Sequence, residues 1–339
     1  MQPATFLLPA LLLAVLAAPG MASTETLVDM VRAVPRPAAG SVESAVPSAT
    51  DRAAFATQLA GLLQETRPPP TVAGYRTVTI AEDGRRLRAL LPTRPGFSPI
   101  VIVAEAPLRD VIIEAPHPEK DRETGAQAAL LLARLGARAA IISAHDRCAA
   151  QADSPCSGRT AVCGGRRRAY PDSDPAHNPS LLFHAAHERL VALWPAAVVV
   201  QLHGFRGRGS DTLFIISDGS GEKRPGDRAL VGRIRDRIRS TLDDGAAAVD
   251  CQDPDDRRIR FPRLCARTNV QGRALNGSND ICRRNAPVPS GRFLHIEQDW
   301  SVREPLRRDW RDATGDRRLA ALLRALAAEL PCLAPGCGR

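Results

Sequence analysis

Two histidines and one glutamate stand at the ends of apolar runs in this chain. His117, His203 and Glu297 each follow a short stretch of mostly Val, Ile, Leu or Phe residues. Apolar runs of that length predict buried strands, and sites in open α/β sheets form at the carboxyl ends of strands. Two imidazoles and a nearby carboxylate can supply three protein ligands to Zn²⁺ and leave a fourth position for water. A further carboxylate can then act as a general base, so the pattern indicates hydrolytic metal chemistry.

Four segments carry a family resemblance in their order along the chain. They are Ala115-Pro-His117, Asp121-Arg-Glu-Thr124, Gln201-Leu-His203 and His295-Ile-Glu297-Gln298. Together they resemble the zinc exopeptidase-like superfamily of carboxypeptidases, and within it the N-formylglutamate amidohydrolase-like and poly-γ-glutamate hydrolase-like proteins. The resemblance spans most of residues 100–305. It implies one zinc ion held by His117, His203 and an acid near 119–121, with Glu297 as the base that acts on an amide or peptide bond.

The third ligand is open at this stage. Carboxypeptidases use His-x-x-Glu, but the third residue after His117 is Lys120. We prefer Asp121, and Glu119 is the alternative. Asp121 could instead be an acid at the start of a helix or a member of a surface ion pair.

Other polar residues are candidates for substrate handling. Arg147 follows the predicted strand that ends at residue 142, where it could hold a substrate carboxylate or stabilise an oxyanion. The alternative is a structural salt bridge with Asp146. Asn269 and Arg273 are loop candidates for substrate contact.

Some readings of these residues need no catalysis. Glu297 could have no role beyond an ion pair with Arg303. His184 and His187 are three residues apart on a predicted helix, and we expect them on its surface. No Gly-x-Ser-x-Gly elbow and no Rossmann or P-loop glycine pattern follows a strand. These absences disfavour serine hydrolases, dehydrogenases and NTPases. The rival class is a non-catalytic exported binding protein that retains the fold.

The elements predict an α/β catalytic domain over residues 73–331. We expect a mixed, mostly parallel sheet with helices on both faces, of the zinc exopeptidase-like kind. A hairpin is predicted around residues 82–84, and residues 251–290 look like an irregular, cysteine-rich excursion. Further strands are expected at 99–103, 111–113, 139–142, 197–202, 212–216 and 293–296, and helices at 51–64, 125–135, 179–193, 227–242 and 317–330.

The ends of the chain and its cysteines indicate export. Residues 1–22 have the apolar core and small residues of a signal peptide. Residues 23–72 form an Ala/Pro-rich lead-in with a short helix, poorly ordered before residue 50, and 332–339 form a tail. The chain has 8 cysteines, an even number as disulfides require, and Cys156/Cys163 and Cys332/Cys337 are close enough to close small loops. We expect a periplasmic or secreted protein with no membrane span after cleavage.

The charge balance bears on the partner. The net charge is +9, but the arginines are interspersed with acids and only 4% of residues are aromatic. A nucleic-acid binder would more typically show a basic stripe with aromatic platforms. We therefore expect no nucleic acid, and a small peptide or amide substrate, with a preference for anionic ones.

Overall fold

The structure, a computed structural model, describes residues 26–64, 74–207, 211–222, 229–245, 247–256, 264–335 and 337. The predicted signal peptide at 1–22 lies outside the described residues. Among those residues, no helix has both the length and the apolar character needed to cross a membrane.

Strands and helices alternate through most of the chain. The strands are β1 (Tyr75–Glu82), β2 (Arg85–Pro92), β3 (Ile100–Ala104), β4 (Val111–Ala115), β5 (Ala139–Ile142), β6 (Arg159–Thr160), β7 (Arg168–Ala169), β8 (Val198–Phe205), β9 (Phe214–Ser217), β10 (Ala248–Asp250) and β11 (Phe293–Asp299). The helices are α1 (Leu27–Ala33), α2 (Ala49–Leu63), α3 (Thr124–Leu135), α4 (Leu182–Leu193), α5 (Leu230–Leu242), α6 (Val270–Leu275), α7 (Trp300–Arg308) and α8 (Arg317–Glu329), with a 3₁₀ turn at Ala313–Gly315.

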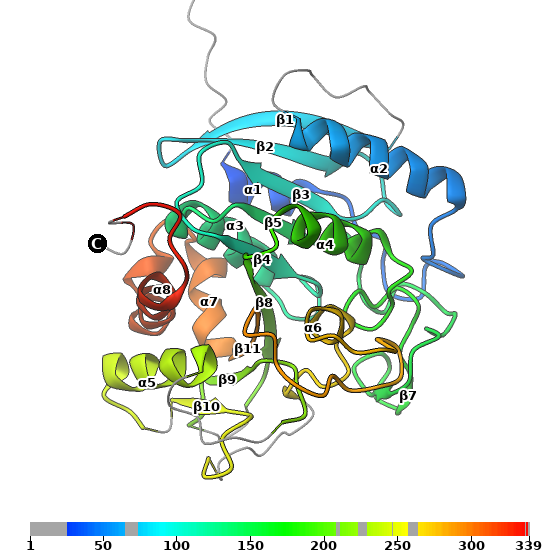
Figure 1. Cartoon of the computed structure of the whole chain (residues 1–339). Helices are drawn as coiled ribbons and strands as arrows, with labels where there is room; N and C mark the ends of the chain where they lie inside the picture. The colour runs from blue at the N-terminus through cyan, green and yellow to red at the C-terminus, as the bar shows by residue number, and fades with distance from the viewer. Residues whose placement is uncertain are drawn as a thin grey trace, which may run out of the picture.

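One mixed sheet of 9 strands organises the molecule, in the order β1-β2-β3-β5-β4-β8-β11-β9-β10. The central strands β5, β4, β8 and β11 run parallel, and β1, β2, β3 and β9 join antiparallel to a neighbour. The predicted α/β class, with a mixed sheet and a parallel core, is confirmed. Helices α1, α3, α5, α7 and α8 cover one face, and α2 and α4 cover the other (Figure 1).

Local signals explain where elements begin and end. Asp83 and Gly84 both have positive φ and join β1 to β2, as a two-residue hairpin turn requires. Helix α3 ends at Leu135, and Gly136 caps it in a left-handed conformation that lets its N–H close the last turn.

Side-chain alternation along the central strands decides where polar groups appear. In β8, Val200 and Leu202 pack into the core beneath α3, while Val199 packs into the core beneath α4. Successive side chains of a strand point to opposite faces. Gln201 and His203 therefore lie on the α4 face. The same rule puts His295 and Glu297 of β11 on that face, because Phe293 packs there.

The lead-in before residue 50 was expected to be poorly ordered, and this was wrong. Leu27, Val28, Met30 and Val31 form the buried side of helix α1 and join the core beneath α3. Helix α1 has only 7 residues. So short a helix is stable here because its apolar side packs against the core.

Four disulfides link all eight cysteines: Cys148–Cys163, Cys156–Cys282, Cys251–Cys265 and Cys332–Cys337. Cys332 and Cys337 pair as their spacing suggested. Cys156 does not pair with Cys163, because it bonds to Cys282 across 126 residues. The set is compatible with an exported protein.

Candidate metal centre

The ends of β4 and β8 bring two imidazoles and one carboxylate together. Asp121 Oδ2 lies 3.3 Å from His117 Nδ1 and 3.3 Å from His203 Nδ1, and the two rings are 4.9 Å apart between centroids. Ligands about 2.0–2.1 Å from a tetrahedral Zn²⁺ are separated by about 3.3–3.4 Å. The spacing of Asp121 from both imidazoles is therefore that of two edges of a tetrahedral site.

A tight turn accommodates the unusual spacing of the first motif. The Asp121 N–H donates to the His117 carbonyl at 2.8 Å, and the Thr124 N–H donates to the Asp121 carbonyl at 3.1 Å. The turn folds the carboxylate back beneath the imidazole four residues earlier. A four-residue spacing is therefore sufficient to bring the Asp121 carboxylate to the His117 imidazole.

The outer nitrogen of each imidazole faces an acceptor. His117 Nε2 donates to Asp174 Oδ1 at 2.8 Å, and His203 Nε2 donates to Gln201 Oε1 at 2.7 Å. The Gln201 amide is oriented because its Nε2 donates to Glu114 Oε2 at 2.8 Å. With the proton on Nε2, each Nδ1 lone pair faces the centre, which is the arrangement of metal-ligating histidines.

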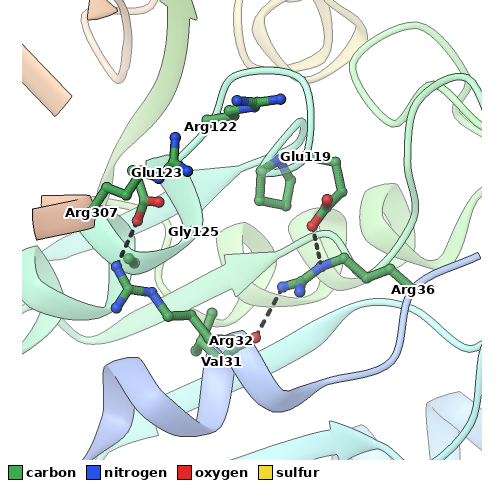
Figure 2. A pocket seen from close by; sticks show the side chains of 10 residues that line it. Val31, Arg32, Arg36, Glu119, Arg122, Glu123, Gly125 and Arg307 are labelled. Carbon is green, nitrogen blue, oxygen red and sulfur yellow. Dashed lines mark hydrogen bonds and ion pairs between the residues drawn. The ribbon is translucent and has the colours of Figure 1, made fainter. Parts of the chain in front are cut away.

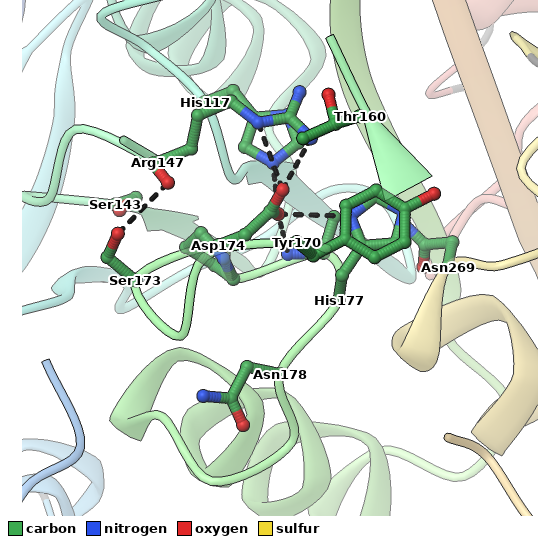
Figure 3. A network of polar contacts seen from close by, with 12 residues as sticks. His117, Ser143, Arg147, Thr160, Tyr170, Ser173, Asp174, His177, Asn178 and Asn269 are labelled. Atoms are coloured by element: carbon green, nitrogen blue, oxygen red, sulfur yellow. Dashed lines mark hydrogen bonds and ion pairs between the residues drawn. The ribbon is translucent and has the colours of Figure 1, made fainter. Parts of the chain in front are cut away.

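A buried carboxylate connects this centre to the long segment between β5 and α4 (Figure 3). Asp174, which is fully buried, accepts from both the Nε and an Nη2 of Arg147 and from His177 Nδ1 at 3.1 Å. His177 in turn stacks on Tyr170, with ring centroids 3.6 Å apart. Arg147 Nη1 remains directed at the centre, 3.3 Å from His117 Nδ1.

Glu297 lies beside the centre without a hydrogen-bond partner for one of its oxygens. Its side chain is only 9% exposed, Oε2 is unpaired, and His295 Nε2 lies 3.9 Å from Oε1. Arg303, the suggested structural partner, donates instead to the carbonyls of Arg122 and Phe205. The carboxylate is therefore held next to the centre and free to accept a proton.

Burial and neighbouring charge set the protonation states. Burial lowers the pKa of His203 to about 4, so this imidazole is neutral and its Nδ1 lone pair is available at neutral pH. Burial also raises the pKa of Asp121, but His117 and His203 outweigh it, and the net pKa is lowered. Burial raises the pKa of Glu297 well above its usual range, and the charge of Asp121 adds to the effect. The Asp121 carboxylate is thus suited to bind a cation, and the Glu297 carboxyl group is suited to exchange protons.

Two other groups of side chains, which share residues with this centre, are alternative candidate metal sites. Among the described residues, His117, Asp174 and His177 also bring ligand atoms within 4.8 Å of one another, as do His203, His295 and Glu297. In the first group, Asp174 is already engaged by Arg147. In the second, the 3.9 Å between His295 and Glu297 is longer than the edge of a compact site. The group with Asp121 fits best.

The other residues predicted for the site do not contact the centre of the candidate metal site directly. Glu119 is exposed and pairs with Arg36 at 3.2 Å, so of the two acids only Asp121 joins the imidazoles. The Asn269 side chain caps α6 and donates to Gln201, which places it behind His203. The three nitrogens of the Arg273 guanidinium donate to Arg267, Ile281, Cys282 and Asn285, and so support the 267–285 loop.

The expectation that His184 and His187 decorate a helix surface was wrong. They are 2% and 1% exposed, and His187 Nδ1 lies 2.7 Å from Glu114 Oε1. The alternative considered for Arg147, a structural salt bridge with Asp146, does not form. Asp146 pairs with Lys120 at 3.3 Å, and Arg147 pairs with Asp174.

Sequence reasoning assigned no role to several polar residues of the centre, although two of them stand in the segments quoted for the resemblance. His295 had a signal, because it lies two positions before Glu297 in the same strand and so shares its face. Gln201 had the same relation to His203. Asp174 and His177 had none, because they come from a segment without helical or strand periodicity.

Comparisons with known proteins give a distant likeness. No protein-family model matches the chain, and no curated protein does. Among solved structures, an N-formylglutamate amidohydrolase from Ralstonia eutropha JMP134 aligns with a TM-score of 0.37 and 14% identity, over 66% of this chain and 96% of that one. A gene product from Agrobacterium tumefaciens aligns with a TM-score of 0.34 and 14% identity, over 65% and 91% of the two chains. At this level of likeness, the case for a function depends on the geometry of the site.

Proposed function

We propose that this protein is a zinc-dependent hydrolase of an amide or peptide bond in a small substrate. The observation that carries the proposal is the group formed by His117, Asp121 and His203, with both outer imidazole nitrogens fixed by acceptors. The neutral imidazole of His203, the imidazole of His117 and the carboxylate of Asp121 together offer the ligand types and the charge that Zn²⁺ prefers. Bound there, the ion would polarise the scissile carbonyl and lower the pKa of a water molecule.

The residues around the centre divide the remaining work. Glu297 accepts the proton of the attacking water and returns it to the leaving nitrogen. Its raised pKa suits both transfers. A Glu297 oxygen lies within 4.8 Å of a His203 ring nitrogen, so one water molecule could bridge the base and the centre. Arg147 Nη1, directed inward, would stabilise negative charge on the carbonyl oxygen.

Behind this first layer, three residues fix the geometry. Asp174 holds both His117 and Arg147 in place, and Gln201 holds His203. Asn269 supports Gln201 from α6, so its contribution to substrate handling would act through His203. Arg273 would act by holding the loop that carries Asn269.

Metal content and activity of matched variants test the proposal. We expect the purified protein to carry about one zinc per chain, His117→Ala and His203→Ala to lose it, and Glu297→Gln to keep it but lose hydrolysis of a panel of N-acylated amino acids and short peptides. His145→Ala is the control, because this histidine is also buried but belongs to none of the three ligand groups. It should keep its zinc and activity.

Two outcomes would contradict the proposal in different ways. Zinc retained by both imidazole variants would show that the ligand assignment is wrong. Zinc bound by the wild type, with no turnover of any substrate on the panel and tight binding of one of them, would favour the non-catalytic binding protein.

A further inference from the structure

A cavity of about 440 Å³ is lined by other residues of the loop that carries His117 and Asp121, among them Glu119 and Arg122 (Figure 2). Its walls come from α1, from the loop itself, from the first turn of α3 and from α7. These helices cover the sheet face opposite to the α4 face, where His203 and Glu297 lie. The cavity is therefore separate from the candidate metal centre.

Four arginines and two glutamates line this cavity. Glu123 is paired with Arg32 at 2.7 Å, and Glu119 is paired with Arg36 at 3.2 Å. The other two arginines are Arg122 and Arg307. Both are exposed, and neither has an ion pair or a side-chain hydrogen bond within the described part of the chain.

The imbalance of charge in this cavity points to an anion. Two guanidinium groups without ion pairs beside two neutralised ones leave a net positive cavity, which attracts negatively charged groups. The start of α3 adds to the effect, because Gly125 and Ala126 of its first turn line the wall and Glu123, its N-cap, makes no side-chain cap. First-turn N–H groups lack intrahelical partners and carry partial positive charge.

We propose that this cavity binds a small molecule through a phosphate or carboxylate group held by Arg122 and Arg307. Guanidinium groups match both oxyanions with paired hydrogen bonds. A volume of about 440 Å³ exceeds the needs of a lone phosphate and falls in the range of small-molecule sites. The anion would thus be one part of a larger ligand. This inference does not depend on the metal chemistry proposed for the other face.

Calorimetric titration of the full chain with inorganic phosphate and, separately, with succinate tests the site. Both titrations are run at fixed ionic strength, with and without 1,10-phenanthroline, a neutral chelator, so that binding to a metal ion is recognised by its loss. The variant is Arg122→Gln with Arg307→Gln. The control is Arg308→Gln, because Arg308 is the next residue of α7, pairs with Glu304 and does not line the cavity.

We expect chelator-independent binding that weakens about tenfold or more in the double variant and stays within about twofold in the control. The anion that binds more tightly identifies the group on the natural ligand. The proposal is overturned if neither anion binds the wild type at millimolar concentration, or if the double variant binds as tightly as the control. Neither result would affect the zinc measurements.

Discussion

Asp174 gives the sharpest test of how this centre is supported. Replacing it with Asn keeps the shape of the side chain but puts an N–H₂ group, which donates, in the place of one of the two accepting oxygens. In the structure, Oδ1 accepts from His117 and His177, and Oδ2 accepts from Arg147. Whichever way the amide turns, one set of donors then faces an N–H₂ group.

The size of the effect follows from these contacts. Loss of an outer partner of a metal-binding histidine typically weakens metal affinity about 10–100-fold, or roughly 1.4–2.7 kcal/mol. Disruption of the buried pair with Arg147 should also lower the free energy of unfolding of the metal-free protein by about 3–5 kcal/mol. The two losses are separable, because one appears in the zinc dissociation constant and the other in metal-free unfolding.

Chelator competition would give the zinc dissociation constant, and denaturant unfolding would give the stability. Asp172→Asn is the matched control. Asp172 is also buried, and it accepts from Ser44 and Ala45 but does not touch the centre. It should lose stability and keep zinc affinity. If Asp174→Asn bound zinc within about twofold of that control, the reasoning about the outer nitrogen of His117 would be refuted.

Three further changes have definite expected outcomes. Arg147→Lys keeps the charge but loses the paired contact with Asp174, so kcat should fall by roughly 10²-fold with little change in KM; a KM effect alone would argue for substrate binding. Burial raises the pKa of Asp250 to about 6, so ionisation of this carboxyl costs the folded state about 2 kcal/mol as pH rises from 4 to 7, and in thermal unfolding Asp250→Asn should gain that much stability relative to the wild type over the same range. Removing Cys156–Cys282, which spans 126 residues, should cost about 5 kcal/mol in denaturant unfolding, against about 2 kcal/mol for Cys332–Cys337, which spans 5; equal costs would contradict the loop argument.

The strand-end part of the centre was predictable because the sheet imposes its own geometry. Apolar runs fixed β4, β8 and β11, parallel pairing aligned their ends, and His203 lies opposite Glu297 in the register of β8 and β11. A local turn was sufficient to bring in Asp121. Each of these steps uses neighbours in sequence or in the sheet.

The supporting layer could not be predicted in that way. Asp174 meets His117 across 57 residues, and no strand pairing connects the two segments. The segment that carries Asp174 has little regular structure, and the disulfides Cys148–Cys163 and Cys156–Cys282 hold it in place. A cysteine count cannot choose among pairings, so the position of this segment was not accessible from sequence.

The unpaired Oε2 atom of Glu297 weighs against a purely structural role for this face of the sheet. Buried acceptors without partners are rare, and leaving one unsatisfied costs about 1–3 kcal/mol. Two cations, Arg147 and Arg303, lie close enough to lower its pKa, yet each donates its hydrogen bonds elsewhere. Gln201 shows the contrast, because as a supporting residue it has partners for both ends of its amide. Glu297 thus has an unsatisfied oxygen next to the three candidate ligands, at a cost in stability. This arrangement is expected for a group that must accept and release a proton.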